Sequence, residues 1–256
     1  MSSAEPLLEC VEVSIDYGGV RAVDRVSLRV EPGTLVGLIG PNGAGKTSLI
    51  DGIAGFTPTA TGRVLVDGVD CARMAPHQRA RRGLARTFQS LELFDDLSVA
   101  DNVLAAAEQP RWWTLFADLV QPGRAATGVA DAEHAMAALG IEALADRSPD
   151  EISQGQRKLV SVARALAGGP RLLLLDEPAS GLSTAESAHL GRRLRTLVDT
   201  GRSILLVDHD MSLVLSVCDV VYVLDFGRVL ASGTPAAIRV DPKVVAAYLG
   251  EQAGAS

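Results

Sequence analysis

Hydrophobic and polar side chains follow two patterns along this chain of 256 residues. Over residues 8–15 and again over 20–30 they alternate, which predicts strands with one buried face. Short continuous apolar runs come later, at 35–39, 171–175 and 203–207. Because helical segments separate these runs, they predict the buried strands of a parallel α/β sheet. The alternating strands predict an antiparallel sheet beside it.

Turn residues predict two hairpins elsewhere in the chain. Residues 62–68 read as a strand that ends in an Asp-Gly pair, which is typical of a tight hairpin turn. The strands expected at 219–224 and 228–232 are joined by the tripeptide Asp-Phe-Gly. A short helix is expected at 242–249.

Helix formers fill much of the middle of the chain. Helical segments are expected at 100–107, 131–139 and 156–167. The Gly- and Ala-rich stretch 123–130 predicts a surface loop between two of them.

A glycine-rich segment follows the apolar run at 35–39. It fits the phosphate-binding pattern G-x-x-x-x-G-K-[ST] and consists of Gly40, Pro41, Asn42, Gly43, Ala44, Gly45, Lys46 and Thr47. The backbone N–H groups of such a loop and the following helix N-terminus surround a phosphate. We expect Lys46 to reach the β- and γ-phosphates and the Thr47 hydroxyl to ligate Mg²⁺. A chance glycine-rich turn is the alternative, and the flanking strand and helix argue against it.

Two carboxylates stand where the apolar run at 171–175 ends. Asp176 and Glu177 would lie at the carboxyl edge of a parallel sheet, where the sites of α/β proteins form. We expect Asp176 to hold Mg²⁺ through water and Glu177 to polarise the water that attacks a phosphate. A solvated acidic pair is the alternative for either residue alone.

A third candidate site precedes the helix expected at 156–167. Ser153 is a natural N-cap, and Gly155 is a small neighbour that leaves the helix start open to an anion. Taken alone, this segment is an ordinary helix cap. Its position shortly before Asp176 makes it a candidate binding site.

Charge and cysteine content narrow the function classes. The net charge of −7 argues against a nucleic-acid backbone as the main partner and offers no attraction to an anionic membrane surface. Cys10, Cys71 and Cys218 are far apart and predict reduced cytosolic thiols. No run approaches the roughly 20 apolar residues that span a bilayer, and the first residues carry no signal-peptide pattern. A cytoplasmic chain that does not enter the membrane by itself is expected.

The order of the motifs resembles the nucleotide-binding subunit of ABC transporters over nearly the whole chain. The motifs are the P-loop, Arg86-Thr87-Phe88-Gln89, Ser153-Gln154-Gly155-Gln156, the run 172–178 and then His209. The resemblance implies a P-loop NTPase core with a parallel sheet, an N-terminal antiparallel β subdomain and an inserted helical subdomain at about 90–167. It also implies a single ABC ATPase domain over 7–250.

Residue roles follow from the same resemblance, with ATP and Mg²⁺ as the ligands. Tyr17 stacks on adenine, Gln89 senses Mg²⁺ and the attacking water, and His209 contacts the γ-phosphate. The signature residues face the γ-phosphate held by the opposite subunit; they are Ser153, Gly155 and Gln156. Separately, each residue has an ordinary structural explanation, and their occurrence together favours the site.

Two positions depart from the family pattern. Gln154 stands where the signature usually has a glycine, which changes the freedom of the backbone to approach a phosphate. Ser183 ends a loop at 180–183 that is exchanged between subunits and usually ends in Asp. Both departures concern contacts between subunits.

The segments 93–99, 227–235 and 246–251 resemble one branch of the family, the first ATPase subunit of branched-chain amino-acid importers. Relatives of this branch serve urea and short amides, and the ATPase of lipopolysaccharide export is a close neighbour. The implied partners are permease subunits, a second copy or a sister ATPase, and indirectly a periplasmic-type solute-binding protein. The permease would hold the chain at the inner face of the cell membrane. A different ABC system or a soluble ABC ATPase without a permease remains the alternative.

A docking groove for the permease is predicted after Gln89. Apolar residues are interrupted by acidic ones there, which is unlike a core helix. The residues expected to line the groove are Leu91, Leu93 and Phe94, with Trp112 and Trp113, whereas Leu97 is expected to pack in the core.

Overall fold

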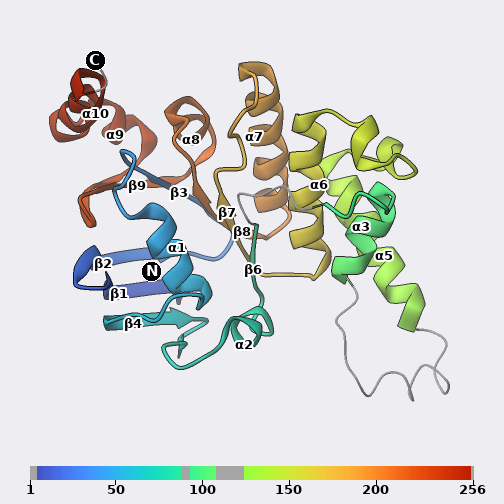
Figure 1. The fold of residues 1–256 in the computed structure, drawn as a ribbon, viewed down its shortest axis with the longest axis horizontal. Coiled ribbons are helices and arrows are strands. Elements are labelled where there is room, and N and C mark those ends of the chain that lie inside the picture. The colour runs from blue at the N-terminus through green and yellow to red at the C-terminus, as the bar shows by residue number, and fades with distance from the viewer. Residues whose placement is uncertain (1–4, 88–92, 108–123, 255–256) are drawn as a thin grey trace.

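The structure is a computed structural model that describes residues 5–87, 93–107 and 124–254. An antiparallel sheet at one end has the strand order β2-β1-β4-β5 (Figure 1). Its strands are β1 (Leu8–Tyr17), β2 (Val20–Val30), β4 (Thr61–Val66) and β5 (Val69–Asp70). The last two form the predicted Asp-Gly hairpin, because β4 pairs antiparallel with β5.

The second sheet has the order β10-β9-β3-β8-β7-β6. Its strands are β3 (Leu35–Ile39), β6 (Leu84–Arg86), β7 (Leu172–Asp176), β8 (Ser203–Val207), β9 (Val220–Asp225) and β10 (Arg228–Gly233). All neighbouring strands pair in parallel except β10, which forms the predicted late hairpin with β9. The predicted parallel α/β core is therefore confirmed.

Helices surround this sheet in the order of the chain. They are α1 (Lys46–Ala54), α2 (Pro76–Ala80), α3 (Val99–Ala107), α5 (Arg124–Leu139), α6 (Gln154–Ala167), α7 (Thr184–Asp199), α8 (Met211–Val217), α9 (Pro235–Val240) and α10 (Pro242–Gly254), with short 3-10 turns at Glu142–Leu144 and Pro149–Glu151. Helices α3, α5 and α6 pack on one another at the end opposite the antiparallel sheet (Figure 1). None of the helices in the described ranges has the length and hydropathy needed to cross a bilayer.

The parallel sheet separates two hydrophobic cores. In β7, Leu173 and Leu175 join a core with α3, α5, α6 and α7, whereas Leu172 and Leu174 face α1 and the antiparallel sheet. Strand β8 alternates in the same way. Because successive side chains of a strand point to opposite faces, a continuous apolar run serves both cores. Helices α1 and α6 therefore lie on opposite faces of the sheet.

Two local expectations are corrected by the structure, and two short elements are new. Residues 124–130, expected as a loop, form the first turns of α5. Their alanines favour a helix strongly enough to offset the single Gly128 within it. The closing helix continues beyond residue 249 as α10. The short elements β6 and α9 were not anticipated.

Candidate functional site

The P-loop connects β3 to α1 and depends on two glycines with positive φ. A Cβ atom at Gly40 would lie 2.1 Å from the carbonyl oxygen of Leu224. At Gly45, which has φ 97°, a Cβ would lie 2.3 Å from the carbonyl oxygen of Ala22. Both contacts are with backbone that cannot move aside, so only glycine fits these positions.

Lys46 folds back over this loop. Its Nζ donates hydrogen bonds to the carbonyl oxygens of Gly40, at 2.7 Å, and Pro41, at 2.9 Å, and the residue is 6% exposed. Lys46 also begins α1, whose first N–H groups lack intrahelical partners and carry the positive end of the helix dipole. Beside it Thr47 is exposed, as are Asn42 and Gly43. This region has the geometry of a phosphate cradle.

Asp176 ends β7 and is 2% exposed. Its Oδ2 accepts a hydrogen bond from Nη2 of Arg86 at 3.1 Å, and its backbone N–H donates to Thr87 Oγ1 at 3.3 Å. The buried Oδ1 has no hydrogen-bond partner among the described residues. Burial raises the pKa of Asp176, and the hydrogen bond from Arg86 opposes that rise.

The residues present fit a bound Mg²⁺. This ion prefers oxygen ligands, keeps several waters, and is held by one or two carboxylates together with phosphates of the substrate. Asp176 offers an unused carboxylate oxygen, and the hydroxyl of the exposed Thr47 is a second oxygen donor. When bound, the ion would neutralise charge on the phosphates.

Glu177 and His209 come together at the ends of β7 and β8. Glu177 Oε2 lies 3.8 Å from His209 Nδ1, and the Glu177 side chain is 18% exposed against 55% for His209. Glu177 has φ 47°, a conformation that a residue other than glycine rarely adopts. A backbone hydrogen bond of 2.7 Å from its N–H to Val207 O fixes this turn. The structure thus brings two predicted catalytic residues side by side.

Two buried charged residues that the sequence did not single out, Asp208 and Lys158, lie beside Glu177 and His209. Asp208 accepts hydrogen bonds from the N–H of Ala179, at 3.1 Å, and of Asp210, at 3.0 Å, and lies 3.6 Å from His209 Nδ1. Burial raises its pKa. From α6, Lys158 reaches the carbonyl oxygen of Glu177 at 3.4 Å, and burial lowers the pKa of Lys158. The sequence gives no sign of these contacts, because an isolated charged residue near a motif does not show which distant group it will meet.

Ser153 caps α6, as predicted. Its Oγ accepts a hydrogen bond from the Gln156 N–H at 3.2 Å, while Gln156 Oε1 accepts from the Ser153 N–H at 2.8 Å. A Cβ at Gly155 would lie 2.7 Å from Glu186 Oε1, so glycine permits this close approach to α7. Gln154, which departs from the family pattern, lies against Gly181 of the 180–183 loop. A Cβ atom at Gly181 would lie 2.8 Å from Gln154 Nε2.

A hollow of about 440 Å³ opens beside this helix start. It is lined by Ser153, Gly155, Gln156, Leu182, Glu186 and His189, among others. Since α6 and α1 lie on opposite faces of the sheet, this hollow is separate from the P-loop.

Tyr17 ends β1 and is 44% exposed, with its hydroxyl 3.2 Å from Thr57 Oγ1. Its ring is available for stacking.

Gln89 lies outside the described residues, as do Leu91, Trp112 and Trp113. Phe94 is 52% exposed, and the Arg164 guanidinium stands 5.0 Å from its ring centre. Leu93 is instead partly buried against the core.

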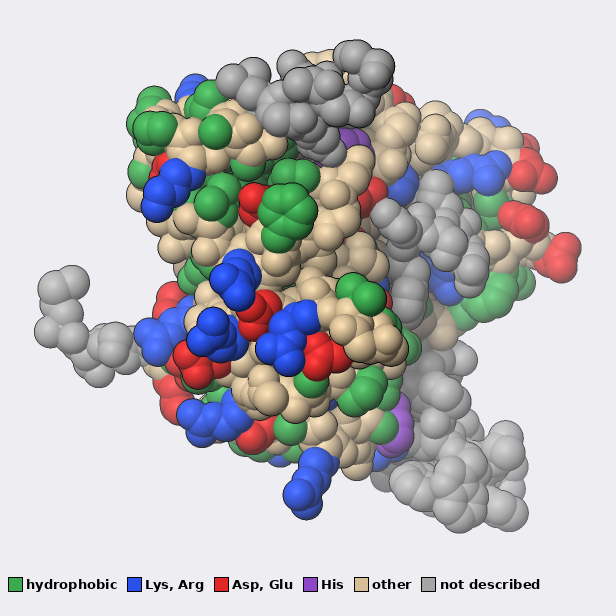
Figure 2. All heavy atoms as spheres, turned by 60° about the vertical axis from the view of Figure 1, so that its left-hand side comes forward, with side chains coloured by type: hydrophobic (Ala, Val, Ile, Leu, Met, Phe, Trp, Pro, Cys, Tyr) green, Lys and Arg blue, Asp and Glu red, His purple; other side chains and the backbone are tan. Residues whose placement is uncertain are grey.

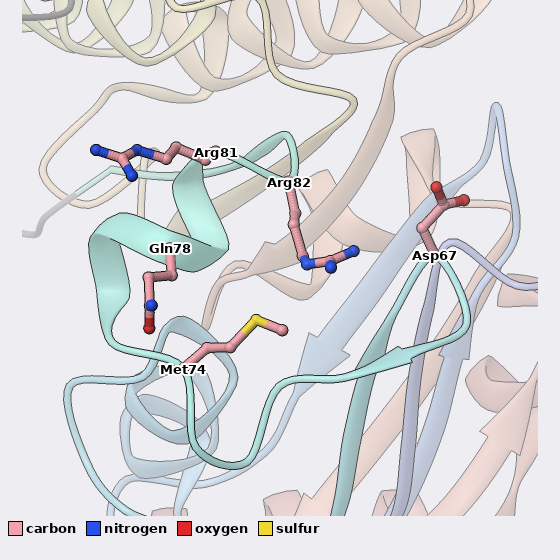
Figure 3. Close-up of a pocket in the computed structure, with 5 residues that line it drawn as sticks. All are labelled: Asp67, Met74, Gln78, Arg81 and Arg82. Carbon is pink, nitrogen blue, oxygen red and sulfur yellow. The ribbon is translucent and has the colours of Figure 1, made fainter. Parts of the chain in front are cut away.

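Other surface features contain none of the predicted site residues. Figure 3 shows a hollow of about 540 Å³ in which the Arg82 side chain points toward Asp67 and Met74, while Arg81 points away. On the antiparallel-sheet side, basic and acidic side chains alternate (Figure 2). Residues of β1 and β2 form the ion pairs Arg21–Asp16, Arg29–Glu9 and, with Arg228 of β10, Arg228–Asp24. Such paired charges form no single-sign patch.

Comparisons with known families agree with this geometry. Residues 23–180, which include the P-loop and Asp176, match the ABC transporter family. The chain belongs to the ABC transporter family. As an ABC ATPase it hydrolyses ATP in a reaction coupled to transport. Residues 228–254 also match a family described as branched-chain amino acid ATP-binding cassette transporter.

Individual relatives of this ABC ATPase cover nearly its whole length. It is 35% identical to the high-affinity branched-chain amino acid transport ATP-binding protein BraF of Pseudomonas aeruginosa, over 97% of this chain and 99% of BraF. It is 36% identical, with the same coverage, to the corresponding protein LivG of Escherichia coli. The lipopolysaccharide export ATP-binding protein LptB of Escherichia coli is 37% identical over 92% of this chain and 93% of LptB.

A solved structure agrees in fold. The ADP conformation of MJ1267, an ATP-binding cassette of an ABC transporter, superposes with a TM-score of 0.83 at 30% identity. The match covers 96% of this chain and 100% of MJ1267. The predicted ABC ATPase fold is therefore confirmed.

Proposed function

We propose that this chain is the ATP-hydrolysing motor subunit of an importer for branched-chain amino acids or related small polar solutes. The match of residues 228–254 to the branched-chain amino acid cassette family carries this proposal. Full-length similarity to BraF and LivG supports it. LptB has comparable identity over a smaller part of the chain, which makes lipopolysaccharide export the second candidate.

The proposed reaction uses positioning and charge. Lys46 holds the β- and γ-phosphates, and the loop N–H groups and the α1 N-terminus bind the remaining phosphate oxygens. Glu177 accepts a hydrogen bond from the attacking water and orients it toward the γ-phosphate. His209, at 3.8 Å from Glu177, donates to the γ-phosphate, and Gln89 is proposed to sense the same water. Tyr17 stacks on the adenine.

The complete site is proposed to form between two ATPase subunits. The P-loop helix α1 and the signature helix α6 pack into different cores on opposite faces of one sheet. This separation supports a site in which the capped helix start at Ser153 meets the P-loop of a partner subunit and not the P-loop of its own chain. In this arrangement Ser153, Gly155 and Gln156 contact the γ-phosphate bound by the partner, which is a second copy or a sister ATPase.

The permease is proposed to dock where Phe94 is exposed. A ring that is half exposed and held by the Arg164 guanidinium offers an apolar anchor of fixed position. Leu93 is withdrawn from this surface, because it packs against the core. Docking at this place would keep the chain at the inner face of the membrane.

Reconstitution tests the proposed function. The chain is co-expressed with the permeases, sister ATPase and solute-binding protein of its own genome neighbourhood and incorporated into proteoliposomes. We expect ATP-dependent uptake of leucine, isoleucine or valine, and stimulation of ATPase activity by the loaded binding protein. ATP turnover that is unaffected by amino acids but stimulated by lipopolysaccharide in detergent complexes would support the export alternative instead. ATP turnover by a chain that forms no complex with any of these permeases would favour a soluble ABC ATPase.

A further inference from the structure

Arg86 makes a three-way contact beside the proposed metal site. This residue ends β6, and its side chain is only 8% exposed. One guanidinium nitrogen, Nη1, bonds to Asp51 of α1, and the other, Nη2, bonds to Asp176 of β7 at 3.1 Å. The ring of Phe56 covers the guanidinium, with its centre 5.6 Å from Cζ. A buried cation thus joins the P-loop helix to the carboxylate predicted to hold Mg²⁺.

Burial makes this contact necessary in the absence of a metal ion. A carboxylate that is 2% exposed is strongly disfavoured in its charged form unless a cation neutralises it. Arg86 supplies that cation to Oδ2, while Oδ1 has no partner among the described residues. Thr87 Oγ1, next in the chain, accepts the Asp176 N–H at 3.3 Å and so holds the backbone of Asp176 beside Arg86.

The same charge opposes a divalent cation. A guanidinium in contact with Asp176 repels any metal ion that approaches the same carboxylate. Nucleotide phosphates bring several negative charges and reverse this balance. We propose that Arg86 is a positioning residue that serves as the internal counter-ion of Asp176, and that it makes metal binding depend on bound nucleotide. This inference rests on the proposed Mg²⁺–ATP site and assigns a role to Arg86, a motif residue to which the family resemblance gave none.

Metal binding to the nucleotide-free protein separates this role from a purely structural one. The probe is Mn²⁺, measured by electron paramagnetic resonance. Arg86→Gln removes the charge, and we expect Mn²⁺ to bind at least about tenfold more tightly than to the wild type. Arg86→Lys keeps the charge and should bind Mn²⁺ close to the wild-type level. Arg171→Gln is the matched control, because Arg171 forms an exposed pair with Asp67 at 2.7 Å. Equal Mn²⁺ affinity in wild type and Arg86→Gln would overturn the proposal.

Thermal unfolding in EDTA without nucleotide gives a second readout. Arg86→Gln should lower Tm by about 5–10 °C, because it leaves a buried carboxylate without its cation. Adding Asp176→Asn should restore most of that loss, since a neutral amide needs no counter-ion. If the two substitutions lower Tm additively, or if the double variant fails to fold, Arg86 does not act through Asp176. Neither readout requires ATP. Failure of the wild type to bind ATP with Mg²⁺ would therefore contradict the proposed function separately.

Discussion

Glu177 combines an uncommon backbone conformation with a reactive position. Its φ of 47° places it in the left-handed region, where a side chain other than glycine costs free energy that surrounding contacts must offset. The 2.7 Å hydrogen bond to Val207 O and the 3.4 Å contact from Lys158 Nζ to its carbonyl provide such contacts. The resulting turn directs the carboxylate toward His209.

We predict that Glu177→Gln reduces steady-state ATP hydrolysis by about 10²–10⁴-fold, because the amide orients water but cannot accept its proton. ATP binding should be retained, since Glu177 lies outside the P-loop. Phosphate release and fluorescent-nucleotide titration measure the two effects. Glu31→Gln, an exposed change before β3, serves as the control. Near-normal turnover of Glu177→Gln would remove this residue from its proposed role.

Tyr17 allows ring and hydroxyl to be tested apart. The ring is 44% exposed and its hydroxyl contacts Thr57 Oγ1 at 3.2 Å. Tyr17→Ala should weaken ATP and GTP binding alike, by about 1–3 kcal/mol, because stacking does not read the base edge. Tyr17→Phe keeps the ring and should bind both nucleotides almost normally. A selective loss of ATP affinity in the Ala variant would contradict stacking, and binding constants from calorimetry decide the matter.

At the scale of elements, helix α6 depends on its N-cap. Ser153→Ala removes the Oγ that accepts the Gln156 N–H, at a cost of about 1 kcal/mol, or about 2–4 °C in Tm. Thr234→Ala removes a comparable cap from α9, where Thr234 Oγ1 accepts the Ala237 N–H at 3.4 Å. Both variants should lose similar stability in calorimetry. Only Ser153→Ala should also lower ATP turnover; a similar turnover in both variants would argue against a signature role for Ser153.

The segment before α3 offers the corresponding test of docking. We predict that Phe94→Ala leaves ATP hydrolysis by the isolated subunit largely intact but reduces copurification with the permeases and transport. Phe226, 90% exposed between β9 and β10, gives the matched control Phe226→Ala. Leu93→Asp should instead lower Tm, because it places a charge against the core. A parallel fall of Tm and ATPase activity in Phe94→Ala would return Phe94 to a structural role.

Element prediction from the sequence succeeded where one rule determined the pattern. The continuous apolar runs at β3, β7 and β8 predicted buried strands. The structure explains these runs, because alternate side chains of each strand enter the two cores. Prediction failed where signals conflicted or were short. The Gly- and Ala-rich stretch 123–130 suggested a loop, although its alanines favour a helix and α5 runs through residues 124–130. Thr234 followed by Pro235 is a helix-start signal that could have revealed α9.

For the candidate site, the motifs located residues and the structure supplied their contacts. A motif at a strand end indicates where Asp176 and Glu177 lie, because the carboxyl ends of parallel strands meet at one edge. It does not indicate which distant cation balances a buried carboxylate. Arg86 pairs with Asp176 only through tertiary packing, which brings together segments separated by many residues. The contacts of Lys158 with the Glu177 carbonyl and of Asp208 with the Ala179 N–H arise in the same way.

In the whole molecule, ATP is proposed to lie between two ATPase subunits. Helices α1 and α6 lie on opposite faces of the sheet, which supports the proposal that a second subunit completes the site. ATP should therefore join two P-loops to two signature segments. The Glu177→Gln variant should bind ATP without consuming it and should keep that assembly from dissociating.

Sedimentation velocity of Glu177→Gln with ATP and Mg²⁺ is the most direct test. The 26.8 kDa chain should sediment at about twice its mass with ATP, either alone or as a pair with its sister ATPase, and as a monomer with ADP. Adding Ser153→Ala should weaken the ATP-bound pair, because the γ-phosphate loses a contact from the opposite subunit. A variant that binds ATP to saturation yet stays monomeric, both alone and with the sister ATPase, would contradict the account.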